Sequence, residues 1–187
     1  RDLDILARMA ERGLVKVAMS VTTLDRKLAR AMGPRAATPP KRLDAIRQLA
    51  AVGVPVTVLV APIVPALNDQ EIEQILAAAH DAGASEAGYV LLRLPLELKD
   101  LFREWLATEY PDRKDRVINI LRSMHGGKDY VAEFGLRQRG AGPYAEQIGL
   151  RFRLAAKRLG MNERGKYRLS TEHFRHPVPK GGQMKLF

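Results

Sequence analysis

Apolar positions along the first half of the chain follow two spacings in turn, one typical of strands and one typical of helices. Nearly continuous apolar runs predict strands at residues 15–21, 54–61 and 87–94. Apolar residues three or four positions apart predict helices at residues 3–12, 24–32, 38–53 and 68–83. Strands that alternate with amphipathic helices pair in parallel through right-handed crossovers, so the pattern predicts an α/β fold with a parallel sheet.

Glycine and capping residues mark the expected ends of these elements. Gly13, Gly53 and Gly83 each follow a helical stretch, at the position where glycine commonly ends a helix. Asn68 followed by Glu71 matches a capping box at the start of a helix. Residues 54–61 are apolar on both faces, which predicts a central strand covered by helices from both sides.

The second half of the chain has a different rhythm. Helical spacing covers residues 97–109, 112–124 and 144–159, with a break at Gly126-Gly127, and little periodicity follows Asn162. We therefore expect an α/β part over residues 1–95, a helical extension over 96–162, and an irregular basic tail over 163–187.

Composition narrows the classes of protein. The chain has no cysteine, which excludes disulfides and thiolate-bound metal within it. No apolar run approaches the roughly 20 residues that cross a bilayer, and no signal peptide opens the chain, so we expect a cytoplasmic protein without membrane contact. We expect no metal ligands among its residues.

Charge suggests a partner. Lys and Arg outnumber Asp and Glu by 31 to 21, for a net charge of +10. A basic surface favours polyanions because neutralised phosphates release counterions, and this predicts DNA as a partner. A basic solvated face is the alternative interpretation.

Ligands of parallel sheets bind beyond the carboxyl ends of the strands, which directs attention to residues 20–23, 62–68 and 93–95. The hydroxyls of Ser20 and Thr22 suit a ribose, or they satisfy backbone groups at a strand end. Lys41 and Arg42 suit a carboxylate, or they lie on an exposed helix face. The segment around Pro62 and Ile63 is rich in proline, which favours a fixed loop that presents carbonyls and apolar walls to a flat ring. No residue shows a recognisable catalytic arrangement.

Four segments, in this order, resemble the second half of a radical S-adenosylmethionine (SAM) barrel, near the spore photoproduct lyase group. They are VKVAMSVTT at 15–23, RAATPPKRLDAI at 35–46, VPVTVLVAPIVPALND at 54–69 and GYVLLRLP at 88–95. The resemblance implies the C-terminal half of a partial (β/α)6 TIM-type barrel with a helical C-terminal extension.

The resemblance also implies a cofactor and a reaction. A [4Fe-4S] cluster would cleave SAM reductively to a 5′-deoxyadenosyl radical, in a lyase-like enzyme of DNA repair or nucleic-acid modification. The three cluster cysteines are expected upstream of Arg1, so we expect this chain to be a piece of the enzyme, inactive by itself.

Site residues follow from the same resemblance. Ser20 and Thr22 would lie at the SAM ribose, and Lys41 or Arg42 at the methionine carboxylate. The residues expected around the adenine are Pro62, Ile63, Asn68, Tyr89 and Leu91.

The last five residues, Gln183-Met184-Lys185-Leu186-Phe187, resemble the peptide with which bacterial proteins bind the sliding clamp. Leu186 and Phe187 would fill an apolar pocket of the clamp, and Gln183 would fix the register. Two other functions stay open: a non-catalytic adaptor recruited to the replication clamp, and a TIM-barrel-type metabolic enzyme.

Overall fold

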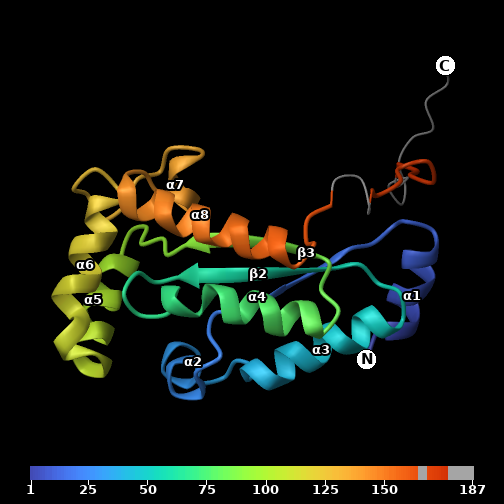
Figure 1. Cartoon of the computed structure of the whole chain (residues 1–187), viewed down its shortest axis with the longest axis horizontal. Helices are drawn as coiled ribbons and strands as arrows, with labels where there is room; N and C mark the ends of the chain where they lie inside the picture. The colour runs from blue at the N-terminus through green and yellow to red at the C-terminus, as the bar shows by residue number, and fades with distance from the viewer. Residues whose placement is uncertain (164–167, 177–187) are drawn as a thin grey trace, which may run out of the picture.

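Three parallel strands form the sheet of this protein, in the order β1-β2-β3 (Figure 1). The computed structural model describes residues 1–163 and 168–176. The strands are β1 (Val17–Ser20), β2 (Val56–Ile63) and β3 (Glu86–Leu91). The α-helices are α1 (Leu3–Glu11), α2 (Arg26–Met32), α3 (Pro39–Ala51), α4 (Ile72–Asp81), α5 (Leu98–Glu109), α6 (Lys114–Ser123), α7 (Leu136–Arg139) and α8 (Pro143–Arg158), with short 3-10 helices η1 (Asp69–Glu71) and η2 (Pro111–Arg113). The predicted strands and their parallel pairing are confirmed.

Local signals explain where the first helices begin and end. The Asp25 side chain accepts hydrogen bonds from the backbone of Lys27 and Leu28, which caps α2. Thr38 precedes α3 and Pro39 begins it, as predicted, although the Thr38 hydroxyl makes no capping bond. Gly53 follows α3 with a φ of +77°, a conformation that L side chains rarely adopt.

The sheet buries one face more deeply than the other. Val56, Val58 and Val60 of β2 are buried, whereas Thr57 and Leu59 between them are half-buried. Helices α3 and α4 pack on β2, and α8 packs against α4. We predicted that helices cover β2 from both sides, and the face that carries Thr57 and Leu59 is only half-buried. The apolar run alone does not say how deeply each face is covered.

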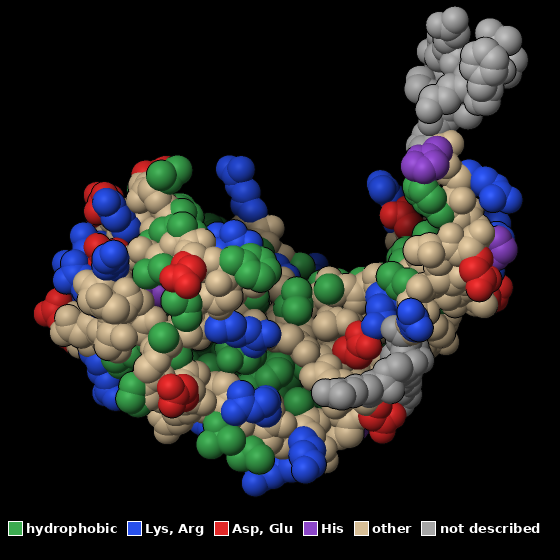
Figure 2. All heavy atoms as spheres, turned by 90° about the horizontal axis from the view of Figure 1, so that it is seen from above, with side chains coloured by type: hydrophobic (Ala, Val, Ile, Leu, Met, Phe, Trp, Pro, Cys, Tyr) green, Lys and Arg blue, Asp and Glu red, His purple; other side chains and the backbone are tan. Residues whose placement is uncertain are grey.

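A polar contact lies on the half-buried face. The Lys16 ammonium lies 2.6 Å from the Glu86 carboxylate, which also accepts a hydrogen bond from the Thr57 hydroxyl. Seen from above, the molecule is hollowed between the end that carries α5 and α6 and the opposite end (Figure 2).

The helical extension is packed onto the sheet and its helices. The α8 residues Ile148, Gly149 and Phe152 are buried, and the Phe152 ring lies 4.8 Å from that of Tyr89 on β3. A Cβ on Gly149 would lie 2.9 Å from the Tyr89 hydroxyl, so a residue without a side chain is needed there. Helices α5 and α6 stand beyond the carboxyl end of β2 (Figure 1).

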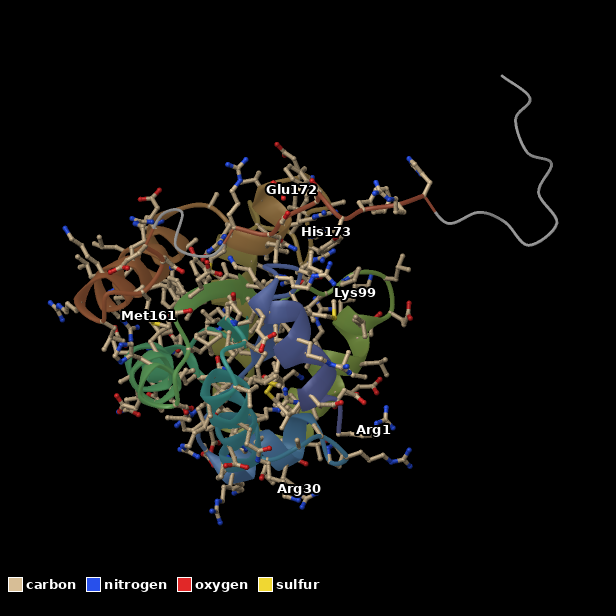
Figure 3. The ribbon with its side chains drawn as sticks, turned by 90° about the vertical axis from the view of Figure 1, so that its right-hand side faces the viewer. Arg1, Arg30, Lys99, Met161, Glu172 and His173 are labelled. Carbon is tan, nitrogen blue, oxygen red and sulfur yellow. The ribbon has the colours of Figure 1, made fainter. Side chains whose placement is uncertain are left out.

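Residues 168–176 follow the extension and run past α1 (Figure 3). The backbone N–H of Ser170 donates a hydrogen bond of 2.9 Å to the carbonyl of Gly13. In the described part of the chain no helix is long and apolar enough to cross a membrane. The clamp-like residues Gln183, Leu186 and Phe187 lie outside the described residues.

Candidate functional site

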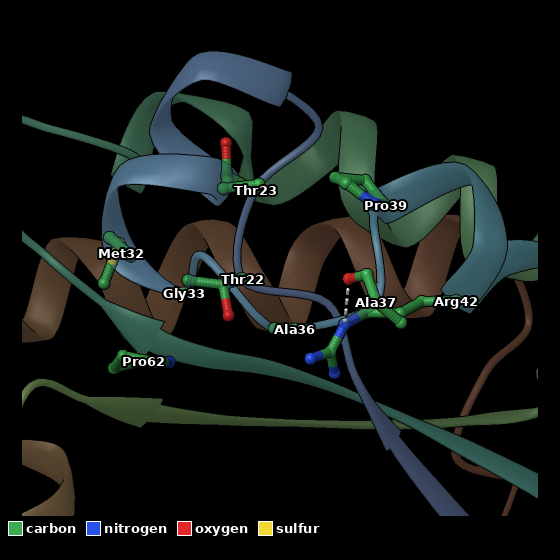
Figure 4. A pocket seen from close by; sticks show the side chains of 10 residues that line it. Thr22, Thr23, Met32, Gly33, Ala36, Ala37, Pro39, Arg42 and Pro62 are labelled. Atoms are coloured by element: carbon green, nitrogen blue, oxygen red, sulfur yellow. Dashed lines mark hydrogen bonds between the residues drawn. The ribbon is translucent and has the colours of Figure 1, made fainter.

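A pocket opens where β1 and β2 end, and we call it the strand-end pocket. Its volume is about 270 Å³. Its walls come from the ends of the two strands, from the connection between α2 and α3, and from the first turns of α3 (Figure 4). The lining residues are Thr22, Thr23, Ala29, Met32, Gly33, Ala36, Ala37, Pro39, Arg42 and Pro62. The position agrees with the general location of ligand sites in parallel sheets.

Arg42 supplies the positive charge of the strand-end pocket. Its Nε donates to the Ala37 carbonyl at 3.0 Å, and its Nη1 donates to the carbonyl and the hydroxyl oxygen of Ser20 at 2.9 and 3.0 Å (Figure 4). No carboxylate of the described residues pairs with this guanidinium. Because carbonyl and hydroxyl partners leave the charge uncompensated, Arg42 favours an anion in the pocket.

The two predicted hydroxyl residues differ in their roles. The Ser20 oxygen accepts from Arg42, which leaves the hydroxyl proton for another acceptor. The Thr22 hydroxyl donates to the Ala61 carbonyl at 2.8 Å, so it satisfies a backbone group at the strand end. This bond ties the end of β1 to β2.

The Asn68 side chain links the ends of β1 and β2 by hydrogen bonds. Its Nδ2 donates to the carbonyls of Thr22 and Pro62 at 2.7 and 3.0 Å, and its Oδ1 accepts from the Val64 N–H at 2.7 Å. The side chain makes no capping bond, so the predicted capping box is wrong. The Oδ1 atom accepts from the Val64 N–H, which precedes Asn68, rather than from an N–H of the helix that follows.

Glu71, the other half of the predicted capping box, also bonds across the fold. Its carboxylate accepts from the Thr23 hydroxyl and from the Leu24 N–H, both at 2.6 Å. The spacing from Asn68 to Glu71 was a real sequence signal, but both side chains fix the segment after β1 rather than their own helix.

The structure separates the two basic residues that the sequence left unresolved. Lys41 is exposed and lines a neighbouring pocket of about 460 Å³, which also contains Arg26 and Arg30. Arg42 lines the strand-end pocket and contacts Ser20. Of the pair, Arg42 is the residue positioned for a ligand at the strand ends.

The remaining predicted residues have side chains in the core. Ile63 and Leu91 are fully buried, and Tyr89 is buried beneath α8. The Arg139 guanidinium carbon lies 3.9 Å from the centre of the Tyr89 ring. A role for these three residues through their backbone stays a prediction.

The residues present do not fit an iron–sulfur cluster. The chain has no cysteine, and the described residues contain no group of three or more His, Cys, Asp or Glu side chains placed to hold a metal ion. A site with one uncompensated guanidinium, hydroxyls and apolar walls fits an organic anion of modest size. A volume of 270 Å³ is at the small end for a cofactor site, which suits one part of a larger ligand.

Comparison with known protein families gives a match over the segment that forms this pocket. Residues 1–79 match the family model described as the Radical SAM superfamily. This segment includes every residue that lines the strand-end pocket. The α/β architecture with its parallel sheet is consistent with part of a radical SAM fold.

Similar proteins are found in mycobacteria and in a virus. The uncharacterized protein Rv2578c of Mycobacterium tuberculosis is 32% identical over 124 residues, which are 65% of this chain and 36% of the relative. The uncharacterized protein ORF301 of Acidianus two-tailed virus is 34% identical over 91 residues, or 46% of this chain and 30% of the relative. The chain thus spans about a third of these relatives' length. No solved structure matches.

Proposed function

We propose that this chain supplies part of the SAM-binding region of a radical SAM enzyme, and that the strand-end pocket takes the methionine end of SAM. The observation that carries the proposal is the uncompensated guanidinium of Arg42, bonded to Ser20 within the segment that matches the radical SAM family. We place the enzyme near the spore photoproduct lyase group, on the order and spacing of the four segments at 15–23, 35–46, 54–69 and 88–95.

Arg42 would bind the methionine carboxylate, since a guanidinium forms charge-assisted hydrogen bonds with carboxylates. Ser20 would donate its hydroxyl proton to the ribose. Bound SAM supplies a 5′-deoxyadenosyl radical in enzymes of this kind, and the chemistry belongs to the cofactor. The residues of this chain bind and orient it, and the cluster that reduces it needs ligands outside this chain.

Binding measurements with two ligands test the role of Arg42. SAM carries the carboxylate, whereas 5′-methylthioadenosine keeps the adenosine part and lacks it. We expect R42Q to weaken SAM binding about tenfold or more, as for loss of a hydrogen bond to a charged group, and to change methylthioadenosine binding little. Isothermal titration calorimetry measures both affinities.

Lys41→Gln is the matched control, because it removes one charge at the adjacent position outside the strand-end pocket. It should leave both affinities unchanged. Equal losses in R42Q and K41Q, or equal losses for the two ligands, would contradict the proposal. Retained methylthioadenosine binding also shows that R42Q is folded.

The substrate of the parent enzyme is a separate part of the proposal. The net charge of +10 supports a nucleic acid, and with it a role in DNA repair or nucleic-acid modification. A chain that binds DNA and the clamp but not SAM would favour the adaptor instead. A chain that binds small phosphorylated metabolites at the strand ends would favour a metabolic enzyme.

A further inference from the structure

A second pocket lies beside the strand-end pocket, and we call it the aromatic pocket. It has a volume of about 260 Å³ and a mainly apolar wall. Its residues are Ala31, Met32, Leu92, Arg93, Leu94, Leu98, Leu101, Phe102 and Trp105. Met32 lines both pockets, so the two pockets adjoin at this residue.

Contacts within the protein fix the aromatic side chains Phe102 and Trp105 of this pocket. The rings of Trp105 and Phe102 are stacked, with centroids 5.5 Å apart and an angle of 20° between planes. Tyr110 contacts Trp105 at 5.6 Å, and the indole N–H donates to the Ala31 carbonyl at 3.2 Å. The indole therefore bridges α5 to α2, and its fixed orientation lowers the entropic cost of stacking against a ligand.

Apolar side chains at this pocket remain open to solvent. Leu98 is 46% exposed and Leu101 is 55% exposed. Leu96, in the connection that precedes α5 and outside the pocket lining, is 81% exposed and has a φ of +50°. Exposed apolar side chains gathered around a pocket mark a binding site more often than an ordinary surface.

Arg93 is the charged residue of the aromatic pocket. Its Nη2 donates to the Tyr130 hydroxyl at 3.2 Å, and its guanidinium lies 5.9 Å from the centre of the Tyr130 ring. Its Nε is buried and has no hydrogen-bond partner. Across residues 1–163 and 168–176, no carboxylate forms an ion pair with it. A half-buried guanidinium with an unsatisfied donor and no counter-charge favours an anionic ligand group.

We infer that the aromatic pocket is the substrate subsite of the same enzyme, and that it binds a flat ring that carries a negatively charged group. The ring contacts Trp105, Phe102 and the leucines, and the anionic group pairs with Arg93. Both nucleotides and aromatic carboxylates have this chemistry. The assignment as a substrate subsite rests on the proposed SAM site next to it, whereas ligand binding by the pocket can be measured independently.

Trp105 reports on the pocket directly, because it is the only tryptophan of the chain. We would titrate the full chain with thymidine 5′-monophosphate and with phenylacetate, and follow tryptophan fluorescence. Thymidine lacks the charge and ribose 5-phosphate lacks the ring, so they separate the two parts of the proposal. We expect saturable quenching by at least one of the two ring-bearing anions. Thymidine and ribose 5-phosphate should bind about tenfold more weakly than thymidine 5′-monophosphate if the nucleotide is the occupant.

Substitutions of residues that line the aromatic pocket test whether the ligand binds there. R93Q should weaken binding of the anionic ligand about tenfold, R93K should weaken it less, and L101A should weaken it without changing the charge. K99Q is the matched control, since Lys99 lies on α5 outside the pocket (Figure 3). Saturation by phenylacetate but not by the nucleotide identifies an aromatic carboxylate, and the reverse result identifies a nucleotide.

Three results would overturn the inference: no saturable quenching by either ring-bearing anion, equal losses in R93Q and K99Q, or ring-free phosphate binding as tightly as the nucleotide. SAM affinity is measured on the same samples. Loss of SAM binding in R42Q with intact quenching concerns only the strand-end pocket. Intact SAM binding without quenching rejects only the aromatic pocket.

Discussion

The buried amide of Asn68 shows how a polar side chain can position a site without touching a ligand. It is 1% exposed and bonds to backbone of Thr22, Pro62 and Val64, which lie at the ends of β1 and β2. Each of these backbone groups is held near the strand-end pocket. We therefore assign Asn68 to the support of that pocket.

Asn68→Ala should lower the free energy of unfolding by about 2–4 kcal/mol, because three backbone groups at the strand ends, buried or partly buried, lose their partner. Urea denaturation measures the difference. Gln70→Ala, at an exposed position two residues on, should change stability by less than about 0.5 kcal/mol. A loss in N68A no larger than in Q70A would contradict the supporting role.

Two glycines that end helices allow backbone conformation to be separated from packing. Gly83 has a φ of +102°, and a Cβ there would lie 2.5 Å from the Ala50 Cβ. Gly53 has a φ of +77° with nothing within 4 Å of a Cβ. Gly53→Ala should therefore cost about 1–2 kcal/mol, from the left-handed backbone alone.

Gly83→Ala should cost more than Gly53→Ala, by about 1–3 kcal/mol, since the methyl group also meets α3. Thermal or urea unfolding of the two variants measures the difference. Equal costs would mean that α3 moves aside without penalty.

Single residues differ in how far the sequence predicts their roles. Gly53 and Gly83 were predictable as helix ends, because a glycine after helical spacing is a local signal. The partners of Asn68 and Glu71 were not, because both bond to residues that are near only after β1 and β2 pair. The charge of Arg42 was predictable, but its choice over Lys41 depends on the direction in which each side chain leaves α3.

Among the helices, α8 is joined to η1 and α4 by polar contacts. The Tyr144 hydroxyl donates to the Asp69 carboxylate at 2.5 Å, and Arg151 pairs with Glu73 at 2.6 Å. Burial, and next the hydrogen bond to Asp69, raise the pKa of Tyr144 to about 12. The bond to Arg151 lowers the pKa of Glu73.

The raised pKa of Tyr144 predicts a loss of stability at alkaline pH. A phenol whose pKa is higher when folded stabilises the protein fully below its unfolded value of about 10, and this contribution is lost as pH rises to about 12. Tyr144→Phe should remove this part of the pH dependence. At neutral pH it should cost about 1–3 kcal/mol, since Asp69 loses a donor.

Urea denaturation at neutral pH and between about pH 10 and 12 measures both effects. Tyr110→Phe is a useful comparison, because burial also raises the pKa of Tyr110 but the Tyr144–Asp69 bond stays intact. A Y144F variant with the stability and the alkaline slope of the unchanged protein would show that this bond does not hold α8.

The helices and strands themselves were largely predictable, and their packing was not. Apolar spacing marked all three strands and the long helices α5, α6 and α8, because each buries one stripe of side chains. The four-residue α7 is too short to show a period. The hydrogen bond from Trp105 to Ala31 of α2 helps to shape the aromatic pocket. It joins residues 74 positions apart, so no local sequence pattern predicts it.

Across the whole molecule, the two pockets lie at one end of a sheet whose second face is only half-buried. The radical SAM match covers residues 1–79. The aromatic pocket is lined by α2, by the segment that follows β3 and by α5, and of its residues only Ala31 and Met32 lie within the matched segment. Under the proposed function, this division would correspond to a cofactor site shared across the family and a separate substrate site. The family match therefore supports the proposed SAM site more directly than it supports any particular substrate.

The last five residues predict recruitment by a bacterial sliding clamp, independently of both pockets. Leu186→Ala together with Phe187→Ala should abolish binding, because buried apolar anchors commonly carry most of the affinity of a short peptide. Surface plasmon resonance on immobilised clamp measures it. Met184→Ala and Lys185→Ala, at the variable positions of the motif, should bind nearly as well as the unchanged chain.

The same double variant separates the two leading functions. SAM binding and tryptophan quenching should be unchanged in it, since the lining described for the two pockets comes from residues between Thr22 and Trp105. Clamp binding with SAM binding would place a SAM-dependent reaction at replicating DNA, and clamp binding without SAM binding would leave the adaptor. If L186A/F187A binds the clamp as well as the unchanged chain, recruitment does not depend on this peptide, and the basic surface becomes the main argument for DNA.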